Sequence, residues 1–327
     1  MILSMEKFLR CVGYLGVLIV SGSVAAADTF PVKPIRFIVG FPPGGVVDIV
    51  ARTVGPGIAD SLGVQVVIDN RGGANGIIGT ELVAKAAPDG YTIGLASIST
   101  MVLNIHLYRN LTYQLKDFTP LTTAGLVPFA IVVHPGVPAQ SLKELIALAR
   151  TKPGRLAFGS PGVGGLQHLT IEMLNSAAKV KVEHVPYKGT GPAMTDVLGG
   201  HIDGVVAGVS GILGSVKAGK LRAVALTGSE RSSSLPELPT AAEQGLPGFV
   251  VVNWYAIVAP PNMPPALANT LHASIVKAVH SPAIAEKLVA AGVEPKTDAS
   301  PAAFAQFVRD DFVRWGKIVK DSGIKAE

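Results

Sequence analysis

The sequence predicts an α/β fold of two lobes, each built on a mostly parallel β-sheet that helices flank. Three observations predict it. Apolar strand-like runs alternate with helical stretches along most of the chain, as in βαβ units. The 327 residues, less a predicted leader of 27, leave 300, which is enough for two domains with cores of their own. Two strands, within 119–134 and 245–261, carry nearby Pro and Gly and look like crossings between the lobes.

The first 27 residues have the features of a secretory signal. Lys7 and Arg10 give the positive start, residues 11–20 form a short apolar core, and the segment ends in small residues at Ala27. A retained membrane anchor is the alternative, but the core is shorter than the about 20 apolar residues that span a bilayer. The sequence therefore predicts cleavage after Ala27 and a periplasmic mature chain.

Composition and charge exclude several classes of protein. The formal net charge of +5 becomes +4 once Lys7, Arg10 and Glu6 leave with the leader, and no Lys/Arg run is present. Nucleic-acid binding would require a clustered basic face, so it is not expected. The single cysteine, Cys11, also leaves with the leader, so disulfide and thiol chemistry are not expected. Mild basicity is compatible with an anionic ligand.

The predicted elements follow in order along the chain. The first strand carries Ile35, Phe37 and Val39, and the helix near 141–150 has Leu142 and Leu145 on one face. The other elements rest on similar patterns. Strands are predicted at 35–40, 64–68, 91–96, 155–159, 181–185, 202–207 and 221–226. Helices are predicted at 46–60, 76–86, 141–150, 165–178, 190–199, 210–218, 264–291 and 301–320.

The two crossings predict the division of the chain into lobes. Residues 28–122 and 255–327 form the first, discontinuous lobe, and residues 123–254 form the second. Such an arrangement leaves a cleft between the lobes, and ligands of α/β folds favour the carboxyl ends of the strands. We expect a monomer, because no long heptad repeat or apolar surface strip is evident.

Four glycine-rich loops each follow a predicted strand and precede a predicted helix. They span 41–48, 70–76, 159–165 and 186–191. Glycine allows close approach of the backbone, and the first N–H groups of a helix have no partner inside it, so such loops can hold an anion. Tyr187 and Lys188 add a hydroxyl and a cation. The alternative is that these are ordinary tight turns, which also need glycine.

Two side chains in these loops have open roles. Asp48 could accept a hydrogen bond from a ligand, or it could be a helix N-terminal carboxylate that the dipole favours, and we favour the second role slightly. His168 has Glu172 at i+4, which is compatible with a metal pair. No third ligand with suitable spacing appears, so no metal is expected and a capping or core histidine is the preferred interpretation.

Five motifs together resemble the Bug-type solute receptors, the extracytoplasmic binding proteins of tripartite tricarboxylate transporters. The motifs are FPPGGVVDIVAR (41–52), NRGGANGIIGTELVAKAAPDGYT (70–92), FGSPGVGGLQHL (158–169), VPYKGTGPA (185–193) and AGKLRAVALTG (218–228). The resemblance spans nearly the whole mature chain. It implies a two-lobed periplasmic-binding-protein fold, no catalysis, no cofactor, and a membrane permease as partner.

The resemblance also implies a ligand site. Ligand carboxylates are caught by the loop after the first strand, by a facing glycine loop in the other lobe, and by the segment after the third strand. In this chain these are Pro43, Gly44, Gly45 and Asp48, then Ser160, Gly162, Val163 and Gly164, then Ser97, Ser99, Thr100 and Asn104. From the loops themselves, His168, Tyr187 and Lys188 complete the candidates.

The chain departs from the family pattern at two places. Val46 and Val47 follow the paired glycines, where small polar residues are frequent in the family, and Ala207 and Gly208 stand where an Asp is frequent. Both changes remove polarity near the predicted cleft. We therefore expect a less polar acid than aspartate or citrate, such as an aromatic or short aliphatic monocarboxylate.

Two other functions remain open from the sequence. A sensory module could bind the same acid and signal to a membrane kinase. An exported hydrolase could use Ser99 or Ser160 with a nearby histidine, although no Ser–His–Asp arrangement can be assembled from spacing alone.

Overall fold

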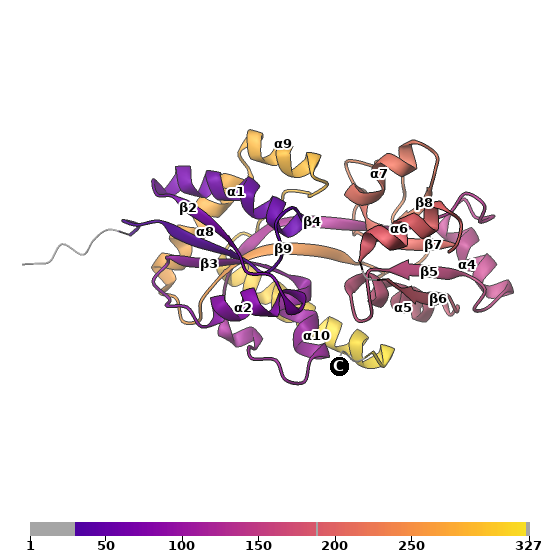
Figure 1. Ribbon diagram of the computed structural model, residues 1–327, viewed down its shortest axis with the longest axis horizontal. Helices are drawn as coiled ribbons and strands as arrows, with labels where there is room; N and C mark the ends of the chain where they lie inside the picture. Colours follow the sequence, from indigo (N-terminus) through magenta and orange to yellow (C-terminus); the bar gives the residue numbers. More distant parts are fainter. Residues whose placement is uncertain (1–29, 188, 325–327) are drawn as a thin grey trace, which may run out of the picture.

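The described part of the chain folds into two α/β lobes joined by two long strands. The computed structural model describes residues 30–187 and 189–324, and within them nine strands form one continuous sheet. Figure 1 shows the two lobes side by side, with β4 and β9 running between them. The two-lobed α/β class predicted from the sequence is confirmed.

Lobe 1 carries a parallel sheet edge in the order β2-β1-β3. Helices α1, α8 and α9 pack on one another, and α2 packs on β1 and β3. Its strands are β1 (Ile35–Val39), β2 (Val66–Asn70) and β3 (Thr92–Ser97). Its helices are α1 (Val46–Leu62), α2 (Ile77–Ala84), α3 (Asn104–Leu107), α8 (Pro265–Val279) and α9 (Pro282–Ala290), with short turns η1 (Ala74–Gly76), η2 (Ser99–Leu103) and η3 (Leu115–Asp117).

Lobe 2 repeats this plan on a smaller scale. Strands β5, β6 and β7 pair in parallel, and β8 lies beside β4. Its strands are β5 (Ala157–Ser160), β6 (Glu183–Pro186), β7 (Gly204–Gly208) and β8 (Arg222–Leu226). Its helices are α4 (Leu142–Thr151), α5 (Leu166–Ala178), α6 (Thr190–Leu198) and α7 (Val209–Lys217).

The two crossing strands pair antiparallel, with each other and with their neighbours. The chain enters lobe 2 through β4 (Thr119–Val133) and returns through β9 (Val252–Ala259), so the two strands run in opposite directions. β4 also pairs antiparallel with β7 and β8, and β3 pairs antiparallel with β9. The parallel pairing expected for each sheet is therefore limited to its outer strands.

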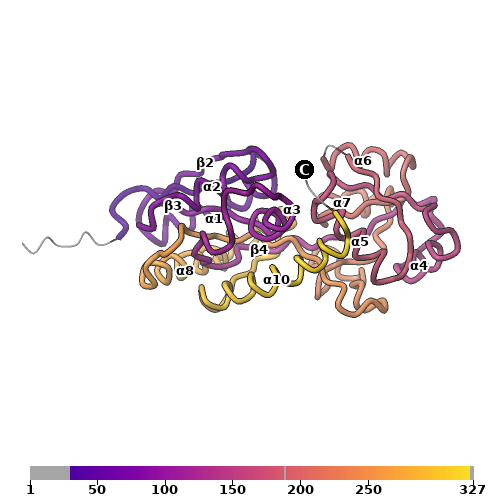
Figure 2. The backbone as a smooth tube through the Cα atoms, turned by 90° about the horizontal axis from the view of Figure 1, so that it is seen from below, coloured from indigo at the N-terminus to yellow at the C-terminus, as the bar shows by residue number. Residues whose placement is uncertain are grey.

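The last helix, α10 (Pro301–Ser322), runs beneath the crossing strands from lobe 1 towards lobe 2 (Figure 2). Ser300 caps its first turn, accepting from the N–H of Ala303. The indole of Trp254 on β9 donates to Asp311 at 2.9 Å, and Phe304 packs edge-on against the same ring. Contacts with β4 and with α5 show that α10 touches the crossing and lobe 2.

The predicted elements agree with the structure to within about two residues at most ends. The predicted helix 264–291 is two helices, because Pro282 cannot donate to the preceding turn and α9 starts there. The predicted lobe boundaries, 122/123 and 254/255, fall inside β4 and β9, and that division stays a prediction. The predicted leader, 1–27, lies outside the described residues.

Candidate functional site

The sheet register brings the carboxyl ends of both sets of strands to the middle of β4. Ser97, the last residue of β3, lies level with Tyr255 on β9, which pairs with Gly125 on β4. Gly208, the last residue of β7, pairs with Phe129. Four residues of extended strand separate the two levels, or about 13 Å. The strands β3 and β7 of the two lobes therefore end at nearby levels along β4.

In lobe 1, the loop after β1 turns through two glycines into α1. Gly44 has φ +88°, a left-handed conformation that favours glycine. Gly45 is the extended N-cap residue and α1 begins at Val46. The N–H of Gly44 donates to Oδ2 of Asp48 at 2.9 Å, so the third helical residue fastens the loop to its own helix.

Asp48 is buried, and both its carboxylate oxygens accept bonds from the protein. Arg52 Nε lies 3.0 Å from Oδ1 and 2.9 Å from Oδ2, and Asn70 Nδ2 donates to Oδ1 at 2.9 Å. Asn70 also donates to the carbonyl of Phe41. Burial acts to raise the pKa of Asp48, but the bonds from Arg52, Gly44 and Asn70 outweigh it and lower the pKa. These bonds agree with the structural role favoured from the sequence, and the ligand role of Asp48 stays a prediction.

In lobe 2, the loop after β5 has the same backbone plan. Gly164 has φ +76°, Gly165 is the extended N-cap and α5 begins at Leu166. The N–H of Gly164 donates to Nδ1 of His168 at 3.1 Å. His168 occupies the third helical position, as Asp48 does in α1. The two loops are therefore alike in geometry and differ in the acceptor that fastens them.

A second histidine supports the lobe 2 loop. The rings of His168 and His184 are stacked, with centroids 3.6 Å apart and planes inclined by 15°. His184 Nε2 lies 2.6 Å from the hydroxyl of Ser160, which accepts from the N–H of Gly162 at 3.2 Å and donates to its carbonyl at 2.9 Å. Burial and the neighbouring His184 lower the pKa of His168 to about 4, and burial lowers the pKa of His184.

These contacts show which backbone N–H groups of the two loops already have an acceptor within the protein. The N–H groups of Gly44, Gly162 and Gly164, all candidates from the sequence, donate to Asp48, Ser160 and His168. Among the described residues, no acceptor is recorded for the N–H groups of Gly45, Val46, Val163 and Gly165. Each loop therefore has two N–H groups at a helix N-terminus without a recorded acceptor, adjacent in lobe 1 and flanking Gly164 in lobe 2.

The segment after β3 joins the lobe 1 loops. Thr100 Oγ1 accepts from the N–H of Ser97 at 3.0 Å, and the amide of Asn104 exchanges bonds with Asn75 of the 70–76 loop. Ser99 is partly exposed and opens a π-helical turn, a feature frequent at functional sites. Pro43 is exposed at the tip of the first loop. The structure thus gathers these predicted residues at one end of lobe 1.

The loop after β6 lies against the loop after β5 in lobe 2. The N–H of Tyr187 donates to the carbonyl of Ser160, and the N–H of Gly189 donates to that of Pro161. The Tyr187 hydroxyl donates to Asp196 at 2.6 Å. Val163 is 61% exposed. Lys188 lies outside the described residues.

Contacts between the lobes are made beside the lobe 2 loop. A methyl carbon of Leu107, from α3 of lobe 1, lies 3.4 Å from the position that a Cβ on Gly164 would take. Ile324, after α10, lies 3.8 Å from the same position. The lobe 2 loop is therefore within contact distance of lobe 1 residues.

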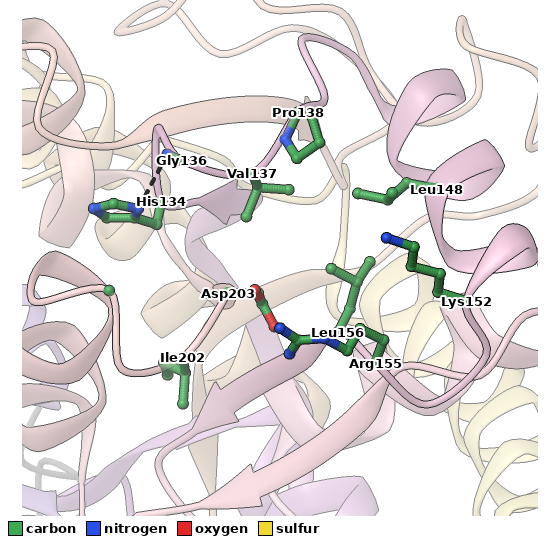
Figure 3. A pocket seen from close by; sticks show the side chains of 11 residues that line it. His134, Gly136, Val137, Pro138, Leu148, Lys152, Arg155, Leu156, Ile202 and Asp203 are labelled. Atoms are coloured by element: carbon green, nitrogen blue, oxygen red, sulfur yellow. Dashed lines mark hydrogen bonds between the residues drawn. The ribbon is translucent and has the colours of Figure 1, made fainter.

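A cavity of about 320 Å³ lies at the other end of lobe 2 and contains none of the candidate residues (Figure 3). It opens at the amino ends of β5 and β7, between α4 and the loop after β4. In Figure 3, Arg155 and Asp203 point towards one another across it. Asp203 accepts from the N–H of Ala157, which ties the starts of β5 and β7 together.

The networks around the two loop acceptors include residues that were not predicted as site residues from the sequence, among them Arg52, Asn70 and His184. The i,i+4 spacing of Asp48 and Arg52 is a readable signal for an ion pair on one helix face. His184 carries no such signal, because the pairing of β5 with β6 brings it beside Ser160. Within the described residues, no cluster of three metal-ligating side chains is found, and no helix is long and apolar enough to cross a membrane.

Comparison with known proteins identifies the family. The model of the tripartite tricarboxylate transporter family receptor matches residues 50–324. The chain belongs to this receptor family. It is 37% identical to Protein BugT of Bordetella pertussis over 321 residues, which cover 97% of this chain and 98% of that protein. The resemblance found in the sequence is thereby confirmed.

Solved structures of the receptor family share the fold. The periplasmic binding protein BugD is 33% identical, with a TM-score of 0.75 over 91% of this chain and 100% of that one. Rpa4515 of R. palustris with adipate is 31% identical, with a TM-score of 0.77 over 90% and 99%. MatC of Rhodopseudomonas palustris with bound malate is 30% identical, with a TM-score of 0.73 over 89% and 100%.

Proposed function

We propose that this protein is a periplasmic receptor that captures a small organic carboxylate between its lobes and delivers it to a tripartite membrane permease. One observation carries the proposal. Two loops of the same geometry, one per lobe, carry backbone N–H groups at helix N-termini for which no acceptor is recorded among the described residues. Such donors suit an anion, and charge-assisted bonds to a carboxylate are stronger than neutral ones.

Capture requires the two lobes to approach. A solute held by donors from both loops makes more contacts when the lobes are close than when they are apart. Binding therefore favours the closed arrangement by the difference in contacts alone. The family's structures with adipate and with malate support a carboxylate as the solute.

We further propose that the solute is less polar than aspartate or citrate. Val46 and Val47 follow the glycines of the lobe 1 loop and pack partly against the core. Val163, at the centre of the lobe 2 loop, is the more exposed apolar side chain. Thermal-shift measurements with benzoate, butyrate, aspartate and citrate test the preference. Stabilisation by aspartate or citrate alone would contradict it.

The donor role of the lobe 1 loop is tested by Val46→Pro. Proline is accepted at the first helical position, and the extended Gly45 before it suits proline, so the substitution removes one N–H with little change to α1. Loss of one bond to a charged group predicts a fall in solute affinity of about tenfold or more. Val46→Ala is the matched control. Mass spectrometry of protein purified with its natural solute supplies the ligand for the titration.

Catalysis is not part of the proposal. The Ser160–His184 contact resembles half of a hydrolytic pair, but the hydroxyl of Ser160 is buried and donates to the carbonyl of Gly162. No carboxylate among the described residues orients the second nitrogen of His184, as a triad requires. Ester or amide turnover that disappears in Ser160→Ala would overturn this view. Cross-linking to co-expressed permease subunits separates delivery from sensing.

A further inference from the structure

The stacked histidines of lobe 2 stand behind the proposed solute loop, and their hydrogen bonds fix their protonation. Nδ1 of His168 accepts from the N–H of Gly164, so that nitrogen carries no proton. The single proton of the Ser160 hydroxyl goes to the carbonyl of Gly162. We therefore assign a proton to Nε2 of His184 for its contact with Ser160. His168 is therefore neutral in this network, and His184 donates through Nε2.

From this network we propose that His168 and His184 are positioning residues of the solute site, holding the lobe 2 loop in its donor-presenting shape only while the His168 imidazole is neutral. The inference rests on the proposed function. Neither ring touches the solute in this scheme. They act through Gly164 and Ser160, which set the direction of the N–H groups of Val163 and Gly165.

Protonation opposes this arrangement in two ways. A proton on Nδ1 of His168 would face the N–H of Gly164, so two donors would meet at 3.1 Å. Charges on both rings together would also repel, since the ring centroids lie 3.6 Å apart. The lowered pKa values of both rings agree with a site built for neutral imidazoles.

The charged side chains around the two histidines offer little stabilisation to a protonated ring. On α5, Glu172 Oε1 lies 3.8 Å from Nε2 of His168 and is partly exposed. On β6, the exposed Glu183 pairs with Lys181. On α6, Asp196 accepts from Tyr187. The last turns of α10, which packs on α5, carry exposed charges at Lys317, Lys320 and Asp321.

The proposal makes the two loops respond differently to acid. Asp48 accepts as a carboxylate, and its pKa is lowered, so the lobe 1 loop keeps its acceptor in mild acid. The lobe 2 loop loses its acceptor when His168 takes a proton. Mild acid should therefore release the Gly164 N–H from its acceptor in the lobe 2 loop, while the Gly44–Asp48 bond of the lobe 1 loop is kept.

Amide hydrogen exchange in the solute-free full mature chain tests this without any ligand. Between pH 7.5 and pH 4, we expect the protection factor of the Gly164 amide to fall at least tenfold, while that of Gly44 changes less than twofold. In His168→Asn, Oδ1 can replace Nδ1 as an acceptor that does not titrate, so Gly164 should stay protected at pH 4. Equal behaviour of Gly44 and Gly164 in the wild type would overturn the proposal, even if the variant did not fold.

Calorimetric titration with adipate, the ligand seen with a relative, then separates the two proposals. From pH 7.5 to pH 4, we expect the affinity of the wild type to fall about twofold further than that of His168→Asn, because about half of His168 carries a proton at pH 4. Adipate itself titrates identically in both measurements. Parallel pH profiles in both proteins would overturn the positioning role. If neither adipate nor the other acids named above bind at pH 7.5, the proposed receptor function is contradicted instead. The hydrogen-exchange comparison of Gly44 and Gly164 would still test the role of the histidines, because it needs no ligand.

Discussion

The loops after β1 and β5 have the same backbone course and different chemistry behind it. Each has a left-handed glycine, an extended glycine N-cap, and a side chain at the third helical position that accepts the glycine N–H. In lobe 1 the acceptor is a carboxylate held by Arg52 and Asn70, and in lobe 2 it is a neutral imidazole held against His184. Backbone geometry therefore creates the donors, and the supporting side chains set the conditions under which they persist.

The two supports also differ in charge next to an anionic solute. Asp48 brings a negative charge that Arg52 offsets. The imidazoles bring none at neutral pH. A second carboxylate behind the lobe 2 loop would repel the solute, so neutral acceptors there preserve the attraction of the helix N-terminus.

The largest effect is expected when the charged support is removed. In Asp48→Ala, the donors of Gly44, Arg52 and Asn70 lose their common acceptor. We expect the free energy of unfolding to fall by about 3–4 kcal/mol, since bonds to charged groups are among the stronger ones. Urea denaturation measures it, with Asp60→Ala, at an exposed position of the same helix, as control. Equal losses in both variants would contradict the supporting role of Asp48.

The next effect is a pH dependence that belongs to lobe 2. The pKa of His168 is about 4 in the folded protein and about 6.5 when unfolded, so the unfolded chain takes up the proton first. Stability is therefore full above pH about 6.5 and is lost as the pH falls towards 4, by about 2–3 kcal/mol. Denaturation curves across this range should show the loss in the wild type and a smaller one in His168→Asn. Identical slopes would refute the assignment.

A smaller loss is expected from the hydroxyl between the histidines and the loop. Ser160→Ala removes the acceptor of the Gly162 N–H and of His184. A cost of about 1–2 kcal/mol follows for buried groups left unpaired. Ser99→Ala is the matched control, because Ser99 is partly exposed and makes no recorded side-chain bond within the described residues. If the two variants melt alike, the Ser160 network contributes nothing measurable.

The smallest effects distinguish the i+4 neighbours of the two acceptors. Arg52, about half exposed, pairs with a charged Asp48, whereas Glu172 faces a neutral His168. At pH 7.5 we expect Arg52→Ala to cost up to about 1 kcal/mol and to cost less at high salt. Glu172→Gln should change stability by less than about 0.5 kcal/mol at either salt concentration. A larger effect of Glu172→Gln would indicate a charged His168.

The sequence predicts the positions of the two glycine loops better than it predicts which backbone N–H donors they offer to a solute. Glycine pairs followed by helical apolar spacing locate 41–48 and 159–165, because few other residues allow such turns. The direction of each N–H depends on the positive φ of Gly44 and Gly164 and on an acceptor four residues later. Amino-acid composition and the spacing of apolar residues do not determine that geometry. The sequence therefore locates the glycines but does not predict which N–H groups of the loops are left without an acceptor.

Residues that meet through the sheet are the least predictable. His184 comes to Ser160 from 24 positions along the chain, through the pairing of β5 with β6. The antiparallel pairing of β4 and β9 likewise follows from connectivity, since one strand leaves lobe 1 and the other returns to it. Local propensity identifies these strands, and tertiary topology alone decides their direction and partners.

The long strand β4 joins the two lobes within one continuous sheet, and its register shifts beside Thr122, Gly125 and Val132. Irregular register is where a strand bends and twists most readily. A movement of one lobe towards the other must therefore bend the β4–β9 strand pair while its inter-strand hydrogen bonds are kept. In the proposed capture, closing the lobes bends this strand pair, and release of the solute lets it straighten.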